Sequence, residues 1–287
     1  MASATPRPLR RRLLQGAAVL LATLGVVAAG ALIPLPAPSP TVPEVAVPDD
    51  FSVWFAARLA ASEAAGAWPV ATERVVRNRA GKADVVFVYV HGFGATRGEG
   101  EYVVDLLARE WSANAYYVRL PGHGTNMDDH AAATHEAYLQ TVAEALAAAE
   151  HLGDKTVLVG TSTGALLATW AAATYPERVD GLILASPFYD YRDSYVKYLA
   201  GSLLGVPLVK LVSGDVRDAG WRSDPEGRVG PNYNQHWLTQ QRFEAIARLE
   251  EVRRVAGRPD LFPKVVAPAL VFVHYADEQH RDGVINI

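Results

Sequence analysis

Five residues, Gly160-Thr161-Ser162-Thr163-Gly164, stand between an apolar run of strand length and a helix-like segment. In that context a G-x-S-x-G pattern predicts a tight turn, whose glycines let strand and helix approach closely while the serine is held in strained geometry at the sheet edge. The same letters often occur by chance, and the simpler alternative is a Ser/Thr-Gly turn that caps the following helix. The context favours Ser162 as an exposed nucleophile.

Apolar runs of strand length alternate with helix-like segments along much of the chain. Such alternation predicts right-handed βαβ units, and therefore an α/β fold in which a mostly parallel sheet carries helices on both faces. The expected strands are 84–90, 115–120, 156–160, 181–186 and 268–275, and the expected helices are 101–111, 134–152 and a segment that ends near Pro176.

The alternation stops between about Phe188 and Phe262, where the chain becomes aromatic and in places rich in glycine. We interpret this segment as a helical cap inserted over the carboxyl edge of the sheet, the alternative being ordinary surface helices. The expected organisation has four parts: an N-terminal segment (1–48), the first part of the core (49–187), the cap or lid (188–262), and an incomplete continuation of the core (263–287).

The N-terminal segment has the features of a membrane-directed sequence. Arg7 and Arg10 to Arg12 precede an uncharged run from Leu13 to Ile33, which as a helix would be about 31 Å long, close to the thickness of a bilayer core. It is either a retained transmembrane anchor or a signal peptide cleaved near Ala31. In both cases the rest of the protein lies outside the cytoplasmic membrane, and the proline-rich stretch to about Pro48 would be a semi-rigid spacer.

Composition excludes several classes of function. A net charge of −4 and a pI of about 6.1 argue against a nucleic-acid partner. Without cysteine the chain can form no disulfide, thiolate metal site or cysteine nucleophile, although this does not identify its compartment. Histidines are scattered without metal-ligand spacing and no phosphate-binding loop is present, so we expect neither a metal nor another cofactor.

A serine nucleophile needs hydrogen-bond donors for the oxyanion that forms on the substrate. The loop His91-Gly92-Phe93-Gly94 follows an earlier buried strand, so the backbone N–H groups of Phe93 and Thr163 are the candidate oxyanion hole. We expect His91 itself to have a structural role at the base of this loop.

Three motifs together resemble the α/β-hydrolase family: HGFG after one strand, LPGHGTN after the next, and GTSTG before a helix. The resemblance covers roughly Val85 to Ile287 and is closest to the monoacylglycerol-lipase, carboxylesterase and serine-aminopeptidase-like branch. It implies the order serine, acid, histidine, with the acid after the strand that follows the cap. Asp282 fits the family pattern of aspartate, one variable residue and two aliphatic residues, and Asp277 is the alternative; either could be a solvated loop carboxylate.

The resemblance also implies a histidine on a loop after one further strand, and none of the eight histidines occupies that position. His280 is only two residues from Asp282, too close to be its usual partner. We therefore expect a C-terminally truncated hydrolase whose 287-residue chain turns over esters weakly. Adding the strand and histidine-bearing loop should raise turnover by about 10³-fold or more.

The expected function is hydrolysis of carboxylic esters with an apolar acyl part, through an acyl-serine intermediate. The apolar cap segment 201–212 would line an acyl pocket or approach a lipid surface, so the substrate is a small or lipid-like ester. One alternative is an aminopeptidase or amidase that holds a free amine on Glu244, Glu250 or Glu251. The other is a catalytically impaired binding protein of the same fold.

Overall fold

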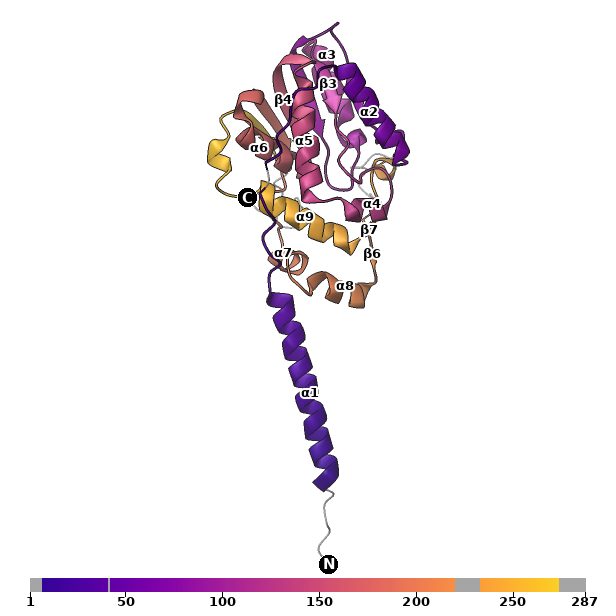
Figure 1. Cartoon of the computed structure of the whole chain (residues 1–287), viewed down its shortest axis with the longest axis vertical. Helices are drawn as coiled ribbons and strands as arrows, with labels where there is room; N and C mark the ends of the chain where they lie inside the picture. The colour runs from indigo at the N-terminus through magenta and orange to yellow at the C-terminus, as the bar shows by residue number, and fades with distance from the viewer. Residues whose placement is uncertain (1–6, 41, 220–232, 274–287) are drawn as a thin grey trace, which may run out of the picture.

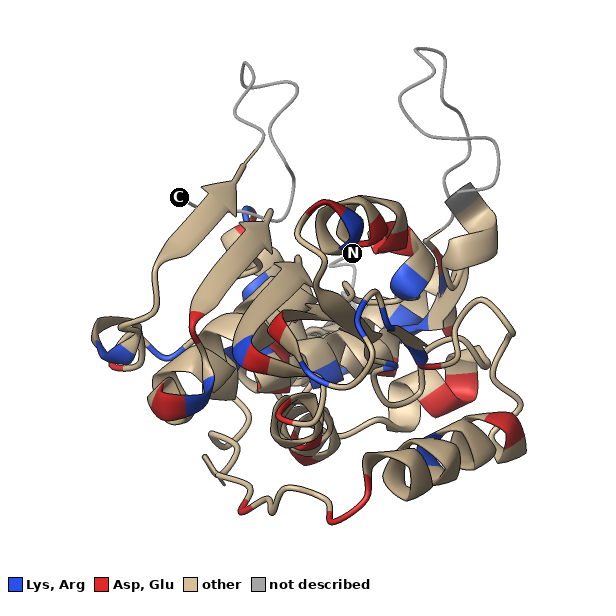
Figure 2. Cartoon of the chain, turned by 90° about the horizontal axis from the view of Figure 1, so that it is seen from above, with Lys and Arg blue, Asp and Glu red and all other residues tan. Residues whose placement is uncertain are grey.

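A six-stranded sheet forms the centre of the protein, whose computed structural model describes residues 7–40, 42–219 and 233–273. The strand order is β1-β3-β2-β4-β5-β8, parallel except for β1, which pairs antiparallel with β3. The strands fan out in Figure 2, with β8 at one edge. The predicted, mostly parallel α/β sheet is confirmed. Its strands are β1 (Arg74–Val76), β2 (Ala83–Val90), β3 (Asn114–Tyr117), β4 (Gly153–Thr161), β5 (Gly181–Ala185) and β8 (Ala269–Phe272).

Helices cover both faces of the sheet. Successive side chains of β2 point to opposite faces, so they pack into two different apolar clusters. Val86, Val88 and Val90 belong to the larger cluster, which includes residues of α5 and α6, whereas Phe87 and Tyr89 belong to the smaller cluster, which includes residues of α3. The helices of the core are α2 (Phe51–Ala64), α3 (Glu101–Glu110), α4 (Met127–Ala132), α5 (His135–Ala149) and α6 (Thr163–Thr174). Short 3₁₀ helices occupy Arg97–Glu99, Pro176–Arg178, Tyr233–His236 and Phe262–Lys264.

The predicted cap segment contains three helices, α7 (Ser194–Ala200), α8 (Gly205–Ser213) and α9 (Phe243–Ala256). It also contains a two-stranded antiparallel ribbon, β6 (Val216–Asp218) with β7 (Gln240–Arg242), which was not predicted from the sequence. Helix α9 contributes Leu249, Val252 and Val255 to the larger core cluster. The cap is therefore attached to the core through α9, while α7 and α8 lie farther out (Figure 1).

Helix α1 (Arg7–Leu32) projects from the rest of the protein on the side of α7 and α8 (Figure 1). By length and composition its segment Arg11–Ala31 is apolar enough to cross a membrane, a test that a signal sequence also passes. The proline-rich stretch after it differs from the expected spacer because it is fastened to the core. Tyr175 Oη donates a hydrogen bond to the Pro43 carbonyl, and His151 Nε2 donates one to the Pro48 carbonyl, both at 2.6 Å.

The first turn of α6 touches the end of β2, and we expect this contact to be intolerant of any side chain. A Cβ at Gly164 would lie 1.9 Å from the Val90 carbonyl oxygen, whereas one at Gly181 would meet only Val157 Cγ2 at 3.5 Å. Gly164→Ala should therefore lower the free energy of unfolding by about 3 kcal/mol or more, and Gly181→Ala should change it by less than about 1 kcal/mol. Urea denaturation measures both, and equal effects would contradict the close approach.

Candidate active site

Ser162 lies in a strained turn at the carboxyl edge of the sheet, between β4 and α6. Its backbone has φ +51° and ψ −114°, a region that costs a non-glycine residue about 1 kcal/mol or more. The turn is held from both sides: the Ser162 N–H donates to the Ala185 carbonyl at 2.9 Å, and the Ser162 carbonyl accepts from the Phe188 N–H at 3.1 Å. The strained turn predicted from the G-x-S-x-G context is present.

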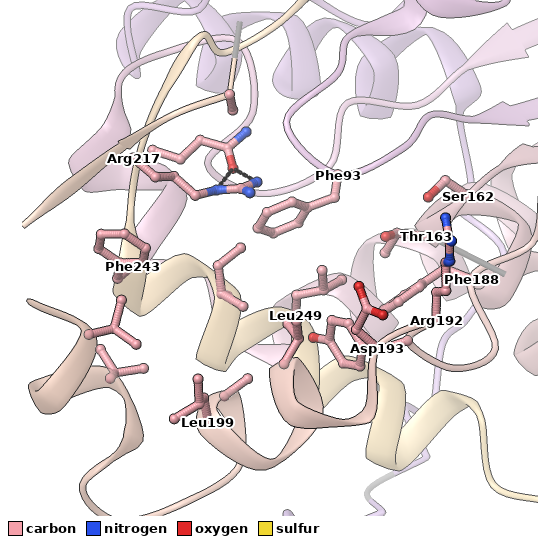
Figure 3. Close-up of a pocket in the computed structure, with 18 of the residues that line it drawn as sticks. Phe93, Ser162, Thr163, Phe188, Arg192, Asp193, Leu199, Arg217, Phe243 and Leu249 are labelled. Carbon is pink, nitrogen blue, oxygen red and sulfur yellow. Dashed lines mark hydrogen bonds between the residues drawn. The ribbon is translucent and has the colours of Figure 1, made fainter. Parts of the chain in front are cut away.

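The two predicted oxyanion donors lie beside this serine. Phe93 and Thr163 line the same cavity as Ser162, as Figure 3 shows. Thr163 is the first residue of α6, and a backbone N–H in the first turn of a helix has no acceptor within that helix. A Cβ at Gly92 would lie 3.4 Å from Ser162 Cβ, so the loop that carries Phe93 passes close to Ser162. The arrangement can stabilise a developing oxyanion.

Glu99 supports the same loop and was not singled out by the sequence, because no motif marks it. Its Oε2 accepts the Gly92 N–H at 2.8 Å and the Tyr89 hydroxyl at 3.0 Å, and that hydroxyl is 3.1 Å from Thr161 Oγ1. Burial of the carboxyl group raises the pKa of Glu99 to about 7, although these hydrogen bonds act in the opposite direction. This hydrogen-bond network therefore links the loop 91–94 to the residue before Ser162.

Two buried histidines fix the other side of the loop. His91 Nε2 accepts the Leu120 N–H at 3.2 Å, and His123 Nε2 accepts the Gly94 N–H at 2.9 Å. Accepting on Nε2 requires the neutral ring, and burial lowers the pKa of His91 to about 4 and that of His123 well below its ordinary value. Both rings therefore act as hydrogen-bond acceptors, in agreement with the structural role expected for His91.

A cavity of about 560 Å³ opens at Ser162 and continues under the cap. Its outer walls come from α7, α8 and α9, and its polar side chains include Arg192, Asp193, Arg217 and Gln241 (Figure 3). Arg217 donates two hydrogen bonds to Gln241 Oε1, at 2.6 and 3.2 Å. The apolar residues contributed by the three helices are Tyr195, Val196, Leu199, Ala200, Val206, Val209, Phe243, Ile246 and Leu249.

The predicted acid, Asp282, its alternative Asp277 and the nearby His280 lie outside the described residues. Within the described ranges, no histidine lines the cavity. These same ranges contain no group of three or more histidine, aspartate or glutamate side chains that could hold a metal ion. Among the described residues, the site therefore consists of Ser162 as the candidate nucleophile, two candidate oxyanion donors and a largely apolar cavity.

The glutamates considered as amine ligands are engaged elsewhere. Glu244 pairs with Lys210, Glu250 with Arg253, and Glu251 with Arg248. None of the three lines the cavity, where Asp193 is the carboxylate among the described lining residues. A free amine bound near Ser162 would not reach the side chains that the sequence suggested.

Comparison with known proteins gives matches of three kinds. The family model described as serine aminopeptidase, S33, matches residues 81–279. The pimeloyl-[acyl-carrier protein] methyl ester esterase of Yersinia pseudotuberculosis serotype O:1b is 32% identical over 117 residues, which are 40% of this chain and 42% of that protein. The putative esterase/lipase 2 of Mycoplasma pneumoniae is 31% identical over 105 residues, which are 35% of this chain and 37% of that protein. The matches thus span less than half the length of these curated relatives.

Among solved structures, one from a study of two metagenome-derived lipolytic enzymes, LipS and LipT, superposes with a TM-score of 0.58 at 23% identity. The alignment covers 71% of this chain and 76% of that one. At this identity the likeness concerns the fold, and it agrees with the sheet order and the helices on both faces described above.

The raised pKa of Glu99 predicts a pH-dependent stability. Between pH 4.5 and about 7 the folded protein holds a proton on Glu99 that the unfolded chain has released, so this group lowers the free energy of unfolding as pH rises through that window. Glu99→Gln removes the ionisation and keeps an acceptor for Gly92. The melting temperature of the variant relative to the parent should therefore rise from pH 5 to pH 7.5. Exposed Glu110→Gln is the control, and a flat difference for Glu99→Gln would contradict the burial argument.

Proposed function

The chain belongs to the serine aminopeptidase S33 family of α/β-hydrolases, and on that premise we propose that it is a serine hydrolase that cleaves carboxylic esters with an apolar acyl part. One observation carries the proposal. Ser162 has positive φ and lines, together with Phe93 and Thr163, a cavity walled mainly by aliphatic and aromatic side chains. This combination supports an acyl chain in the cavity and its carbonyl carbon at the serine.

The chemistry follows from this placement. The Ser162 hydroxyl attacks the acyl carbon, its proton passes to a base, and the carbonyl oxygen becomes an oxyanion that the two amides stabilise. Collapse of this tetrahedral intermediate releases the alcohol, which takes up a proton, and leaves an acyl-serine. Water then hydrolyses the acyl-serine. The order of residues in the family implies a histidine base oriented by an acid, and for the acid we propose Asp282.

The composition of the cavity supports an ester over a peptide substrate. A free amine needs a carboxylate to hold it, and the three glutamates considered for that role are paired with basic residues away from the cavity. Asp193 remains as the carboxylate among the described lining residues, most of which are apolar. Both curated relatives named above are esterases by name, one of them as a putative esterase/lipase. The apolar walls from the cap match a hydrocarbon chain, because such a chain gains about 0.8 kcal/mol for each methylene group that it buries.

The acyl-serine intermediate can be trapped with a p-nitrophenyl ester of a medium-length acid. We expect the peptide that contains Ser162 to gain the mass of the acyl group. This adduct should be absent in Ser162→Ala. Ser186→Ala is the matched control, because Ser186 also has positive φ (+46°) at the end of the neighbouring strand and does not line the cavity. Mass spectrometry after acid quenching measures the adduct.

Several outcomes would contradict the proposal. They are an adduct that persists in Ser162→Ala, the absence of both adduct and turnover in the parent chain, and faster cleavage of aminoacyl p-nitroanilides than of the esters. The last result would favour the aminopeptidase alternative, with Asp193 as the carboxylate in the cavity.

The acid is tested by comparing two aspartates that the sequence left as alternatives. In a variant to which the family's strand and histidine-bearing loop have been added, Asp282→Asn should slow acylation of Ser162 by up to about 10⁴-fold if Asp282 orients the base, whereas Asp277→Asn should leave the rate within about threefold of that extended chain. Stopped-flow release of p-nitrophenol measures both rates. The reverse ranking would assign the role to Asp277.

A further inference from the structure

The carboxyl end of α1 is bonded to the loop between α7 and α8. The N–H groups of Leu203 and Leu204 donate to the carbonyls of Ile33 and Gly30, at 2.9 and 3.3 Å, and the Leu35 N–H donates to the Gly201 carbonyl at 2.7 Å. A Cβ at Gly30 would lie only 2.2 Å from Leu204 Cδ1, so helix and loop are in direct contact. These bonds fix the cap relative to the end of the apolar helix.

The chain just beyond α1 is held as well. Arg254, on α9, donates to the carbonyls of Leu35 and Pro36, at 3.0 and 3.1 Å. Since α9 contributes residues to the larger core cluster, the end of α1 is connected through α9 to the core. Residues on both sides of the predicted cleavage position at Ala31 thus take part in the folded structure.

Beside this junction the cap exposes large apolar side chains, which we name the cap face: Tyr198, Leu203, Leu211 and Val212. Their exposed fractions are 64%, 53%, 82% and 85%. The nearby cation Lys210 is paired with Asp215 and Glu244. Figure 1 shows α7 and α8 at the end of the protein from which α1 leaves. Exposed apolar residues gathered in this way indicate a surface that another apolar phase covers.

We propose that the cap face lies in the lipid boundary of the bilayer that α1 crosses, and that the substrate is a lipid ester taken from that bilayer. Arg11–Ala31 is about 31 Å long, enough to span the hydrocarbon core. Its end therefore reaches the membrane surface, and the bonds to Leu203 and Leu204 hold the cap face at the same level. This inference rests on the proposed function and on retention of α1.

The sides of α7 and α8 that face away from the cap face line the cavity that leads to Ser162. Leu199, Val206 and Val209 face that cavity, and Tyr195 both lines it and is 62% exposed. Two short helices, apolar on both sides, thus separate the bilayer from the cavity. In the proposed arrangement, an acyl chain that moves from the bilayer past these helices stays next to apolar side chains, which preserves its hydrophobic stabilisation.

The cysteine-free sequence allows a direct test on the full chain, because any introduced cysteine is unique. Leu211→Cys and Val212→Cys are labelled with an environment-sensitive fluorophore and reconstituted in phosphatidylcholine and phosphatidylglycerol vesicles. Val103→Cys, on α3, is the control, since it is also exposed (58%) and apolar but lies at the end of the protein opposite α1 (Figure 1). Lipids with a doxyl group high on the acyl chain should quench the labels at 211 and 212 at least about twofold more than the label at 103.

Three results would overturn the inference: equal quenching at all three positions, loss of α1 from the protein isolated from membranes, or a disulfide between two copies at Leu211→Cys that excludes the quencher. The last would mean that a second copy covers the cap face. The parent chain without a label provides the mass reference for retention of α1.

A functional comparison separates failure of this inference from failure of the proposed activity. Leu211→Glu combined with Val212→Glu should reduce hydrolysis of a long-chain ester embedded in vesicles by about 10-fold or more. Hydrolysis of a soluble short-chain p-nitrophenyl ester should stay unchanged, because neither residue lines the cavity. An equal loss on both substrates, or no loss on either, would contradict the membrane role, whereas loss of short-chain turnover in Ser162→Ala reports only on the proposed activity.

Discussion

The first turn of α6 rests directly on the last residue of β2, and the geometry of the site depends on that contact. Gly164 has no room for a Cβ above the Val90 carbonyl, so α6 can start close to the sheet only with glycine there. This closeness brings Thr163 and Ser162 next to the loop that carries Gly92 and Phe93. If the backbones were farther apart, the two candidate oxyanion amides would not converge on one carbonyl oxygen.

Three buried side chains then hold the loop 91–94 in place, each by accepting a backbone N–H on a side-chain lone pair. His91 and His123 accept backbone N–H groups from Leu120 and Gly94, and Glu99 accepts the Gly92 N–H. An unpaired N–H at these positions would carry a desolvation cost of about 1–3 kcal/mol. The loop is therefore positioned by its hydrogen bonds, and the altered pKa values of these groups are a consequence of the burial that such positioning requires.

The sequence predicted the order of the five parallel strands because apolar runs of strand length alternate with helix-like segments. The run 84–90, for example, is continuous and apolar, and β2 (Ala83–Val90) matches it closely. The antiparallel edge strand β1 and the helices α2 and α4 were not predicted. The β6–β7 ribbon was missed because each strand has three residues, too short for a period of two to show. The proline-rich stretch, expected as a spacer, is bonded to the core at Pro43 and Pro48. Composition indicates its stiffness but not its partners.

By itself the sequence determined the fold class, the strained turn at Ser162 and the apolar character of α1, because each follows from patterns among residues that are close in the chain. Only the tertiary structure decided that Glu99 supports the loop of the candidate donor Phe93 and that Leu203 and Leu204 bind the end of α1. These contacts use ordinary backbone and carboxylate groups, so no sequence motif marks them. The contacts at α1 join residues about 170 positions apart in sequence, which no local pattern can reveal. They form because packing of the sheet, the cap and α9 brings those segments together.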